Sequence, residues 1–165
     1  MDAVNMPELA LYQPDIAQNA GTLLRLCACL GVSAHIIEPA GFPASDHAFR
    51  RAGLDYLDHV VIRRHIHFAA FRDMVRREGR RLVLVETTGA TIYGRFSFSD
   101  RDILMLGRES AGVPDEVAQM SDASVVIPMR PGLRSLNVAA AGAMVLGEAM
   151  RQTGRFPQPA EDDET

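Results

Sequence analysis

The chain has 165 residues, a length that suits one domain built around a single buried core. Hydrophobic residues make up 47% and charged residues 23%, as in an ordinary globular protein, and no run of about 18 apolar residues exists that could span a membrane. The formal net charge of −4 argues weakly against a nucleic-acid partner, and residues 1–7 lack the basic and apolar stretches of a secretory signal, so a cytoplasmic location is expected.

Short apolar runs alternate with amphipathic segments along the chain. The expected strands cover residues 8–12, 33–38, 60–62, 82–85, 103–106 and 125–127. The expected helices cover residues 18–30, 46–52, 67–78 and 136–151, with one more beginning near Pro114 and with Gly31 as a C-cap. Continuous apolar strands between helices indicate a parallel α/β sheet covered on both faces, and ligands of such sheets bind at the carboxyl ends of the strands.

The cysteines and histidines do not have the spacing of a metal site. Cys27 and Cys29 lie two residues apart on an expected helix and point to different faces, so both are interpreted as small buried side chains. His65 and His67 could share one face of a strand, but the start of a solvated helix is the favoured interpretation. We therefore predict no metal.

Acidic residues are concentrated at the C-terminal end. Residues 156–165 are interpreted as a disordered tail that follows a single domain over residues 8–155. Without the four acids at positions 161–164, the rest of the chain has as many acidic as basic residues. Every basic residue is arginine, which a bias in base composition would explain, although the planar guanidinium also suits RNA phosphates. Charge is therefore compatible with an RNA partner without requiring one.

Three segments combine glycine, proline and polar residues in unusual ways. The first contains Asn19, Gly21 and Arg25 near the start of an expected helix. A glycine there permits close backbone approach, and Arg25 lies one turn later on the same face. Arg25 is interpreted either as a plain surface residue or as a buried anion-binding group.

The second segment, residues 104–114, is a strand that leads into a loop with glycines at positions 107 and 112 and one acid, Glu109. The loop resembles part of a phosphate-binding loop, but a chain without lysine lacks the Walker lysine, and the G-x-G-x-x-G pattern is also absent. We expect this loop to hold a ligand other than a nucleoside triphosphate, or none.

The third segment, residues 127–139, is a loop with two prolines and a glycine that leads into the last expected helix. Ser135 is the expected N-cap of that helix, and Asn137 lies in its first turn. A well-capped helix would explain these two residues, but it leaves Arg130 and Arg134 beside the cap unexplained.

Together and in this order, the three segments resemble the motifs of the SPOUT RNA methyltransferases, in the branch that methylates ribose 2'-hydroxyls. The pattern N-x-G-x-x-x-R matches residues 19–25, L-G-x-E-x-x-G matches residues 106–112, and I-P-M…S-L-N-V matches residues 127–138. Residues 11–16, 35–39 and 50–56 narrow the resemblance to the TrmL-like subgroup, the tRNA (cytidine(34)-2'-O)-methyltransferases. The resemblance covers residues 9–155.

This resemblance implies an α/β fold with a deep C-terminal trefoil knot, which the general rule of unknotted chains would not predict. It implies S-adenosylmethionine as the cofactor, the anticodon stem-loop of tRNA as the substrate, and a homodimer. The implied cofactor-binding residues are Glu86, Thr87, Leu106, Gly107, Gly112, Ile127, Met129, Ser135 and Leu136. The expected RNA contacts are Arg50, Arg51, Arg130 and Arg134.

The implied reaction transfers a methyl group to the wobble ribose of leucine tRNAs, at cytidine(34) or 5-carboxymethylaminomethyluridine(34). By position, Arg25 is the family's catalytic arginine. Because the pKa of arginine exceeds about 12, we expect Arg25 to hold a phosphate or stabilise alkoxide charge instead of acting as a base. Glu109 is expected to orient Arg25 or another arginine through a charged hydrogen bond. The other expected catalytic residues are Asn19, Ser135 and Asn137.

Two alternatives to this function stay open. One is a SPOUT 2'-O-methyltransferase that acts on ribosomal RNA or on another tRNA nucleotide, although the chain lacks an added RNA-binding domain. The other is a nucleotide- or RNA-binding relative without catalysis. Ala139 favours the second alternative, because relatives often carry serine or asparagine there.

Overall fold

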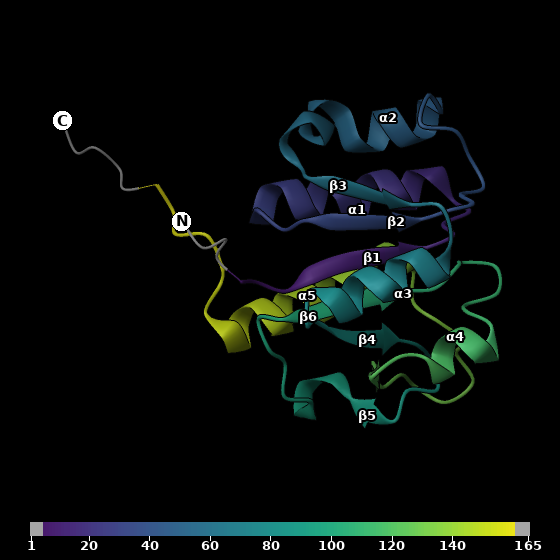
Figure 1. Cartoon of the computed structure of the whole chain (residues 1–165), viewed down its shortest axis with the longest axis vertical. Helices are drawn as coiled ribbons and strands as arrows, with labels where there is room; N and C mark the ends of the chain where they lie inside the picture. The colour runs from purple at the N-terminus through teal and green to yellow at the C-terminus, as the bar shows by residue number, and fades with distance from the viewer. Residues whose placement is uncertain (1–4, 161–165) are drawn as a thin grey trace.

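The fold is a parallel sheet between two layers of helices (Figure 1). A computed structural model describes residues 5–160, in which seven strands pair in the order β3-β2-β1-β6-β4-β7-β5. The strands are β1 (Glu8–Tyr12), β2 (Ala34–Ile37), β3 (Ile62–His65), β4 (Arg81–Val85), β5 (Thr91–Ile92), β6 (Asp102–Leu106) and β7 (Ala123–Val126). Every pairing is parallel, which confirms the expected fold class.

The helices divide between the two faces of the sheet. On one face α1 (Ala17–Leu30) and α5 (Val138–Thr153) pack over a large apolar cluster, and α2 (His47–Gly53) packs on α1. On the other face lie α3 (Phe68–Arg77) and the short α4 (Asp115–Gln119), over a smaller apolar cluster. Figure 1 shows α3 in front of the strands and α5 behind them. Two 3-10 helices, η1 (Leu54–His59) and η2 (Tyr93–Arg95), complete the described elements.

The predicted elements agree with the structure except at certain ends. Gly31 ends α1 at φ 67°, the left-handed conformation expected of a C-cap glycine. The predicted strand at 60–62 is wrong by about two residues, because β3 is an edge strand that continues through Arg63 and Arg64. The predicted strand at 125–127 also begins earlier, at Ala123. The elements η1, β5 and η2 were not predicted.

The N-cap of α5 is Asn137, not Ser135 as predicted. The Asn137 side chain accepts hydrogen bonds from the backbone N–H groups of Ala139 and Ala140, at 2.8 and 3.2 Å. Asn137 itself has an extended backbone, at φ −53° and ψ 136°. Both residue types cap helices well, so the local sequence did not distinguish them.

Small residues bring helices α1, α2 and α5 close together. A Cβ added to Gly21 of α1 would lie 2.5 Å from the carbonyl oxygen of Phe49 and 2.7 Å from the Cβ of Ala52, both in α2. A Cβ added to Gly142 of α5 would lie 2.7 Å from the Leu23 side chain of α1. The three helices therefore pack at distances that larger residues would not permit.

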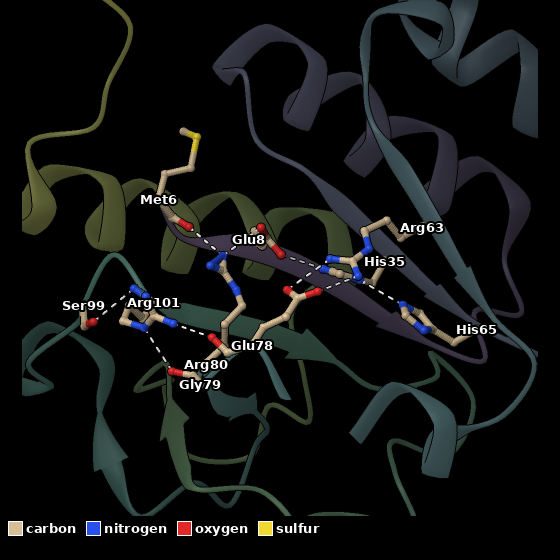
Figure 2. Close-up of polar contacts among 10 residues, drawn as sticks. All are labelled: Met6, Glu8, His35, Arg63, His65, Glu78, Gly79, Arg80, Ser99 and Arg101. Carbon is tan, nitrogen blue, oxygen red and sulfur yellow. Dashed lines mark hydrogen bonds and ion pairs between the residues drawn. The ribbon is translucent and has the colours of Figure 1, made fainter. Parts of the chain in front are cut away.

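The opposite face of the sheet contains a buried polar chain, Glu8–His35–His65 (Figure 2). The His35 side chain is fully buried, with its Nε2 atom 2.6 Å from a carboxylate oxygen of Glu8 and its Nδ1 atom 3.0 Å from Nε2 of His65. Arg80 forms an ion pair with Glu8 at 2.8 Å and donates to the Met6 carbonyl oxygen at 2.9 Å. The side chains of Glu8, His35 and His65 thus all have hydrogen-bond partners, as burial requires, whereas Nε of Arg80 is buried without one.

The Glu8–His35–His65 chain corrects the interpretation of His65. Only His67 is at a helix start, where its Nδ1 atom accepts the N–H of Ala70 at 3.1 Å. His65 lies in β3, and burial, followed by the positive charges of His35 and Arg63, lowers its pKa to about 4.

Two other sequence interpretations concern cysteines and membranes. Cys27 is buried as predicted, and burial raises the pKa of its thiol to about 12, but Cys29 is exposed and that part of the prediction is wrong. A helix exposes one face to solvent, and position 29 lies on it. Among residues 5–160 no helix is long and apolar enough to cross a membrane, and no three His, Cys, Asp or Glu side chains gather in a way that could hold a metal ion.

Candidate cofactor and RNA site

A cavity of about 730 Å³ lies where β4, β6 and β7 end. Its walls come from residues 84–88, 106–113, 127–129 and 134–138, with Ile16 and Asn19 from the start of α1. The three segments that are distant in sequence therefore meet at one edge of the sheet, where a parallel α/β fold places its ligands. The expected site residues in the lining are Asn19, Glu86, Thr87, Leu106, Gly107, Glu109, Gly112, Ile127, Met129, Arg134, Ser135, Leu136 and Asn137.

The loop after β6 is closed on itself by two backbone hydrogen bonds. The N–H of Arg108 donates to the Gly112 carbonyl oxygen at 2.9 Å, and the N–H of Gly112 donates to the Arg108 carbonyl oxygen at 2.8 Å. A Cβ on Gly107 would lie 2.8 Å from the Cα of Gly112, which itself has φ 64°. Both glycines are therefore required by the turn itself, because a side chain would clash or strain the backbone at these positions.

Asp15, for which the sequence predicted no role, joins this loop to the loop after β1 by hydrogen bonds. Its backbone N–H donates to Oε2 of Glu109 at 3.1 Å, and the N–H of Glu109 donates to Oδ1 of Asp15 at 3.1 Å. The Ser110 hydroxyl also donates to the Asp15 carboxylate. The side-chain hydrogen bond with Glu109 is the main cause that lowers the pKa of Asp15 to about 2, whereas burial and then Asp15 raise the pKa of Glu109.

Asn19 and Asn137 meet at the mouth of the cavity. Nδ2 of Asn137 donates to Oδ1 of Asn19 at 3.1 Å, while the other amide atom of Asn137 caps α5. This contact joins the start of α1 to the start of α5. The side chain of Asn137 thus caps α5 and also holds Asn19, another expected catalytic residue, next to it.

Arg25 lies outside the cavity lining, exposed on α1. Its guanidinium carbon is 4.6 Å from the centroid of the Tyr56 ring in η1. The expected contact with Glu109 is not formed in this chain, because the Glu109 carboxylate bonds the Asp15 backbone instead. Sequence alone gave no signal for Tyr56 beyond its place in the segment at residues 50–56.

The remaining expected RNA contacts are distributed over two regions. Arg50 and Arg51 are exposed in the last turn of α2, on the side of the molecule that carries Arg25 and η1. Arg134 lines the mouth of the cavity and Arg130 is exposed nearby in the same loop. Within residues 5–160 the side chains of these four arginines make no ion pair, so their guanidinium groups are open to a ligand.

Known proteins resemble this chain over almost its whole length. A protein from Ancylobacter novellus, tRNA (cytidine(34)-2'-O)-methyltransferase, is 64% identical over 148 residues, which are 90% of this chain and 94% of that protein. A solved structure that gives insight into the 2-OH methylation of C/U34 on tRNA has 42% identity and a TM-score of 0.85, covering 90% of this chain and 96% of the other.

A second solved structure is more distant and contains a cofactor. It is the SpoU methyltransferase AviRb from Streptomyces viridochromogenes in complex with AdoMet, with 26% identity, a TM-score of 0.82 and coverage of 90% of this chain and 60% of the other. The family model described as the SpoU rRNA methylase family matches residues 6–147. With the sheet order, the cavity at the strand ends and these matches in agreement, the chain belongs to the SpoU rRNA methylase family.

Proposed function

We propose that the chain is an S-adenosylmethionine-dependent 2'-O-methyltransferase that acts on the wobble ribose, cytidine(34) or modified uridine(34), of leucine tRNAs. The observation that carries the proposal is the cavity of about 730 Å³ built from all three sequence motifs. The activity named for the Ancylobacter relative, at 64% identity, supports the tRNA position.

The residues of the cavity fit S-adenosylmethionine. Its volume is within the range of about 300–1,000 Å³ that is usual for small-ligand sites. Leu106, Ile127 and Leu136 give apolar walls for an adenine ring, and Glu86 and Thr87 give groups that hydrogen-bond hydroxyls or an amine. Gly107 and Gly112 also line the cavity, and without side chains they let a ligand approach the backbone of this loop closely. S-adenosylmethionine, when bound, supplies an electrophilic methyl group on its sulfonium.

The nucleophile in this reaction is a ribose 2'-hydroxyl, which is weak until it loses its proton. Arg25 holds the phosphate beside that ribose and stabilises the developing alkoxide charge, a role that uses the permanent charge of arginine. Asn19 and Asn137, joined at 3.1 Å, orient groups at the cavity mouth, and Ser135 lies beside them in the lining. Glu109 acts through the loop that it fixes to Asp15.

RNA binding is assigned to Arg50, Arg51, Arg130 and Arg134, together with Arg25. Their open guanidinium groups suit phosphate contacts of the anticodon stem-loop. Many other arginines of the chain are committed to carboxylates, such as Arg81 to Asp102 at 2.7 Å. Among residues 5–160, Arg76, Arg77 and Arg95 also form no ion pair, so it is the position of the assigned arginines in the matched motifs, and not the lack of a partner alone, that supports the assignment. We expect the protein to meet tRNA in the cytoplasm.

We further propose that the chain forms a homodimer and that its C-terminal part forms the trefoil knot of SPOUT proteins. Ile16, Leu136 and Met144 lie near the cavity or on α5 and are 45%, 40% and 42% exposed. Exposed apolar side chains around a functional site are typical of an interface. A molar mass of two chains in multi-angle light scattering is expected, and that of one chain would contradict the dimer.

The function is tested with leucine tRNA transcripts, labelled S-adenosylmethionine and nucleoside mapping. We expect one methyl group per tRNA on the wobble ribose, and none on a matched transcript with 2'-deoxycytidine at that position. A product at another tRNA nucleotide, or in ribosomal RNA only, would overturn the substrate assignment. Calorimetric binding of S-adenosylmethionine without transfer to any of these RNAs would instead indicate the non-catalytic relative that Ala139 favours.

Arg25→Lys is the matched variant for the catalytic role. Lysine keeps the charge but loses the planar fork of donors, so we expect kcat to fall by at least about tenfold with unchanged S-adenosylmethionine affinity. Turnover close to that of the original protein would show that the fork is not used.

A further inference from the structure

Arg25 is held by an aromatic ring and by no acid. Its guanidinium carbon lies 4.6 Å from the centroid of the Tyr56 ring, within the range of a cation–π contact. Among residues 5–160, Arg25 takes part in no ion pair and no side-chain hydrogen bond, and it is exposed whereas Tyr56 is half-buried. The ring is therefore the fixed partner and the guanidinium the group that it orients.

The backbone near Tyr56 is arranged to bring its ring to α1. At Gly21 the helices α1 and α2 are in such close contact that a Cβ would lie 2.5 Å from the Phe49 carbonyl oxygen. At the end of α2, Leu54 has φ 50° and ψ −143°, a conformation that is strained for a residue with a side chain. The chain turns sharply there, and η1 returns along α1 with Tyr56 beside Arg25.

An aromatic partner has a consequence that an acidic partner would not have. A ring covers one flat face of a guanidinium, so the N–H groups around its edge stay free to donate. A carboxylate would occupy two of those donors and offset the charge. Arg25 can thus be held in place while it keeps all its donors for a phosphate or a ribose oxygen.

Arg81 provides a comparison within the same molecule. Its guanidinium carbon also lies over a ring, 4.9 Å from the centroid of Phe96. However, its N–H groups donate to the carboxylate of Asp102 at 2.7 and 2.8 Å and to the Ser97 carbonyl oxygen at 2.8 Å. The N–H groups of Arg81 are thus used in contacts within the protein, whereas Arg25 has the same type of ring contact and keeps its N–H groups free for a ligand.

We propose that Tyr56 is a positioning residue for the methyl transfer, which acts by holding the Arg25 guanidinium face-on so that its N–H edge meets the substrate ribose and phosphate. The proposal rests on the catalytic role of Arg25 proposed above. It assigns a role to the ring of Tyr56 and none to its hydroxyl.

The test compares Tyr56→Leu with Tyr56→Phe at saturating tRNA and S-adenosylmethionine. Loss of a cation–π contact at a partly exposed site corresponds to about a threefold to thirtyfold change. We expect Tyr56→Leu to lower kcat by about tenfold, with S-adenosylmethionine affinity by calorimetry unchanged, and Tyr56→Phe to stay within twofold. An equal loss in both variants, or no loss in Tyr56→Leu, would overturn the proposal.

Two controls separate positioning from stability. Phe96→Leu removes the matched ring contact of Arg81, and we expect its kcat in the folded protein to be unchanged. Tm is measured for each variant, and Tyr56→Met replaces Tyr56→Leu if the leucine variant does not fold. A fall in kcat for Phe96→Leu as large as that for Tyr56→Leu would assign the effect to packing and overturn the proposal.

Arg25→Ala distinguishes failure of this inference from failure of the proposed function. We expect Tyr56→Leu to have no additional effect on kcat in the Arg25→Ala background, because the ring then has nothing to hold. A further tenfold loss there would mean that Tyr56 touches the RNA itself and would overturn the positioning role. Full activity of Arg25→Ala would contradict the catalytic role of Arg25, whereas an inactive Arg25→Ala beside a fully active Tyr56→Leu would contradict this inference alone.

Discussion

The two faces of the sheet are held together by different means. On the face covered by α1 and α5, the packing is apolar and depends on glycines such as Gly21 and Gly142, each of which leaves no room for a Cβ. On the face covered by α3, a fully buried histidine, His35, joins Glu8 to His65, and Arg80 neutralises Glu8. Packing on the first face thus depends on the shapes of apolar side chains, whereas packing on the second face also depends on paired charges.

This difference matches the location of the residues proposed above to take part in the reaction. Asn19, Arg25 and Asn137 all belong to α1 or the start of α5, on the face whose packing is apolar. On the other face, buried charges pair with one another, as those of Arg80 and Glu8 do. Substitutions on the two faces are therefore expected to have different consequences.

The largest effect is expected from Glu8→Ala on the α3 face. Its removal leaves Arg80, whose side chain is 6% exposed, and the buried His35 without their acidic partner. Breaking a buried ion pair in this way costs about 3 kcal/mol. Denaturant titration should show that loss, while kcat of the folded protein stays unchanged. A fall in kcat would mean that the two faces are not separate.

On the α1 face, Gly21→Val is expected to cost about 2 kcal/mol, because overpacking must push α2 away from α1. Here kcat should fall as well, since the shift moves η1 and the ring that holds Arg25. Gly147→Ala is the matched control, because a Cβ at that position of α5 meets nothing within 4 Å. Chemical denaturation and methyl-transfer rates are measured for both variants. A Gly21→Val protein with the kcat of the original protein would contradict the expected link between this packing and the position of Arg25.

Asp15→Ala tests the hydrogen bonds that join the loop after β1 to the loop after β6. It removes the carboxylate that accepts from the N–H of Glu109 at 3.1 Å and from the Ser110 hydroxyl. We expect the affinity for S-adenosylmethionine to fall by about tenfold, or about 1.4 kcal/mol, as a less ordered loop binds more weakly. Titration calorimetry measures this change, and unaltered affinity would show that the loop is ordered without Asp15.

The smallest effect concerns pH and the α3 face. Burial in the folded protein lowers the pKa of His65 to about 4 from its usual 6.5, so between these values the unfolded chain binds a proton that the folded chain does not. Stability is complete above about pH 6.5 and decreases as the pH falls towards 4. The loss is on the order of 1 kcal/mol after allowance for solvent screening. His65→Gln should flatten this part of the curve of unfolding free energy against pH; an unchanged slope would exclude His65.

The sequence predicted the parallel sheet because its strands are apolar runs, and it predicted a ligand site at the carboxyl ends of the strands because parallel sheets bind their ligands there. The cap at Asn137 was missed because Ser135, two residues earlier, caps helices as well. The exposure of Cys29 was missed because the sequence did not show which side of the helix faces solvent. The contacts of Asp15 and Tyr56 were missed because each is made with a partner distant in sequence, Glu109 and Arg25 respectively.

The order of the strands also affects when the protein becomes competent during its synthesis. The interior strand β1 pairs with β6, with Glu8 opposite Ile103, so an N-terminal strand must wait for residues almost 100 positions later. The cavity then needs residues 127–138, which leave the ribosome later still. Such distant pairings slow folding and leave sheet edges open in the meantime. A cofactor that binds only the completed cavity therefore stabilises the fully folded protein, by an amount that increases with the concentration of the cofactor.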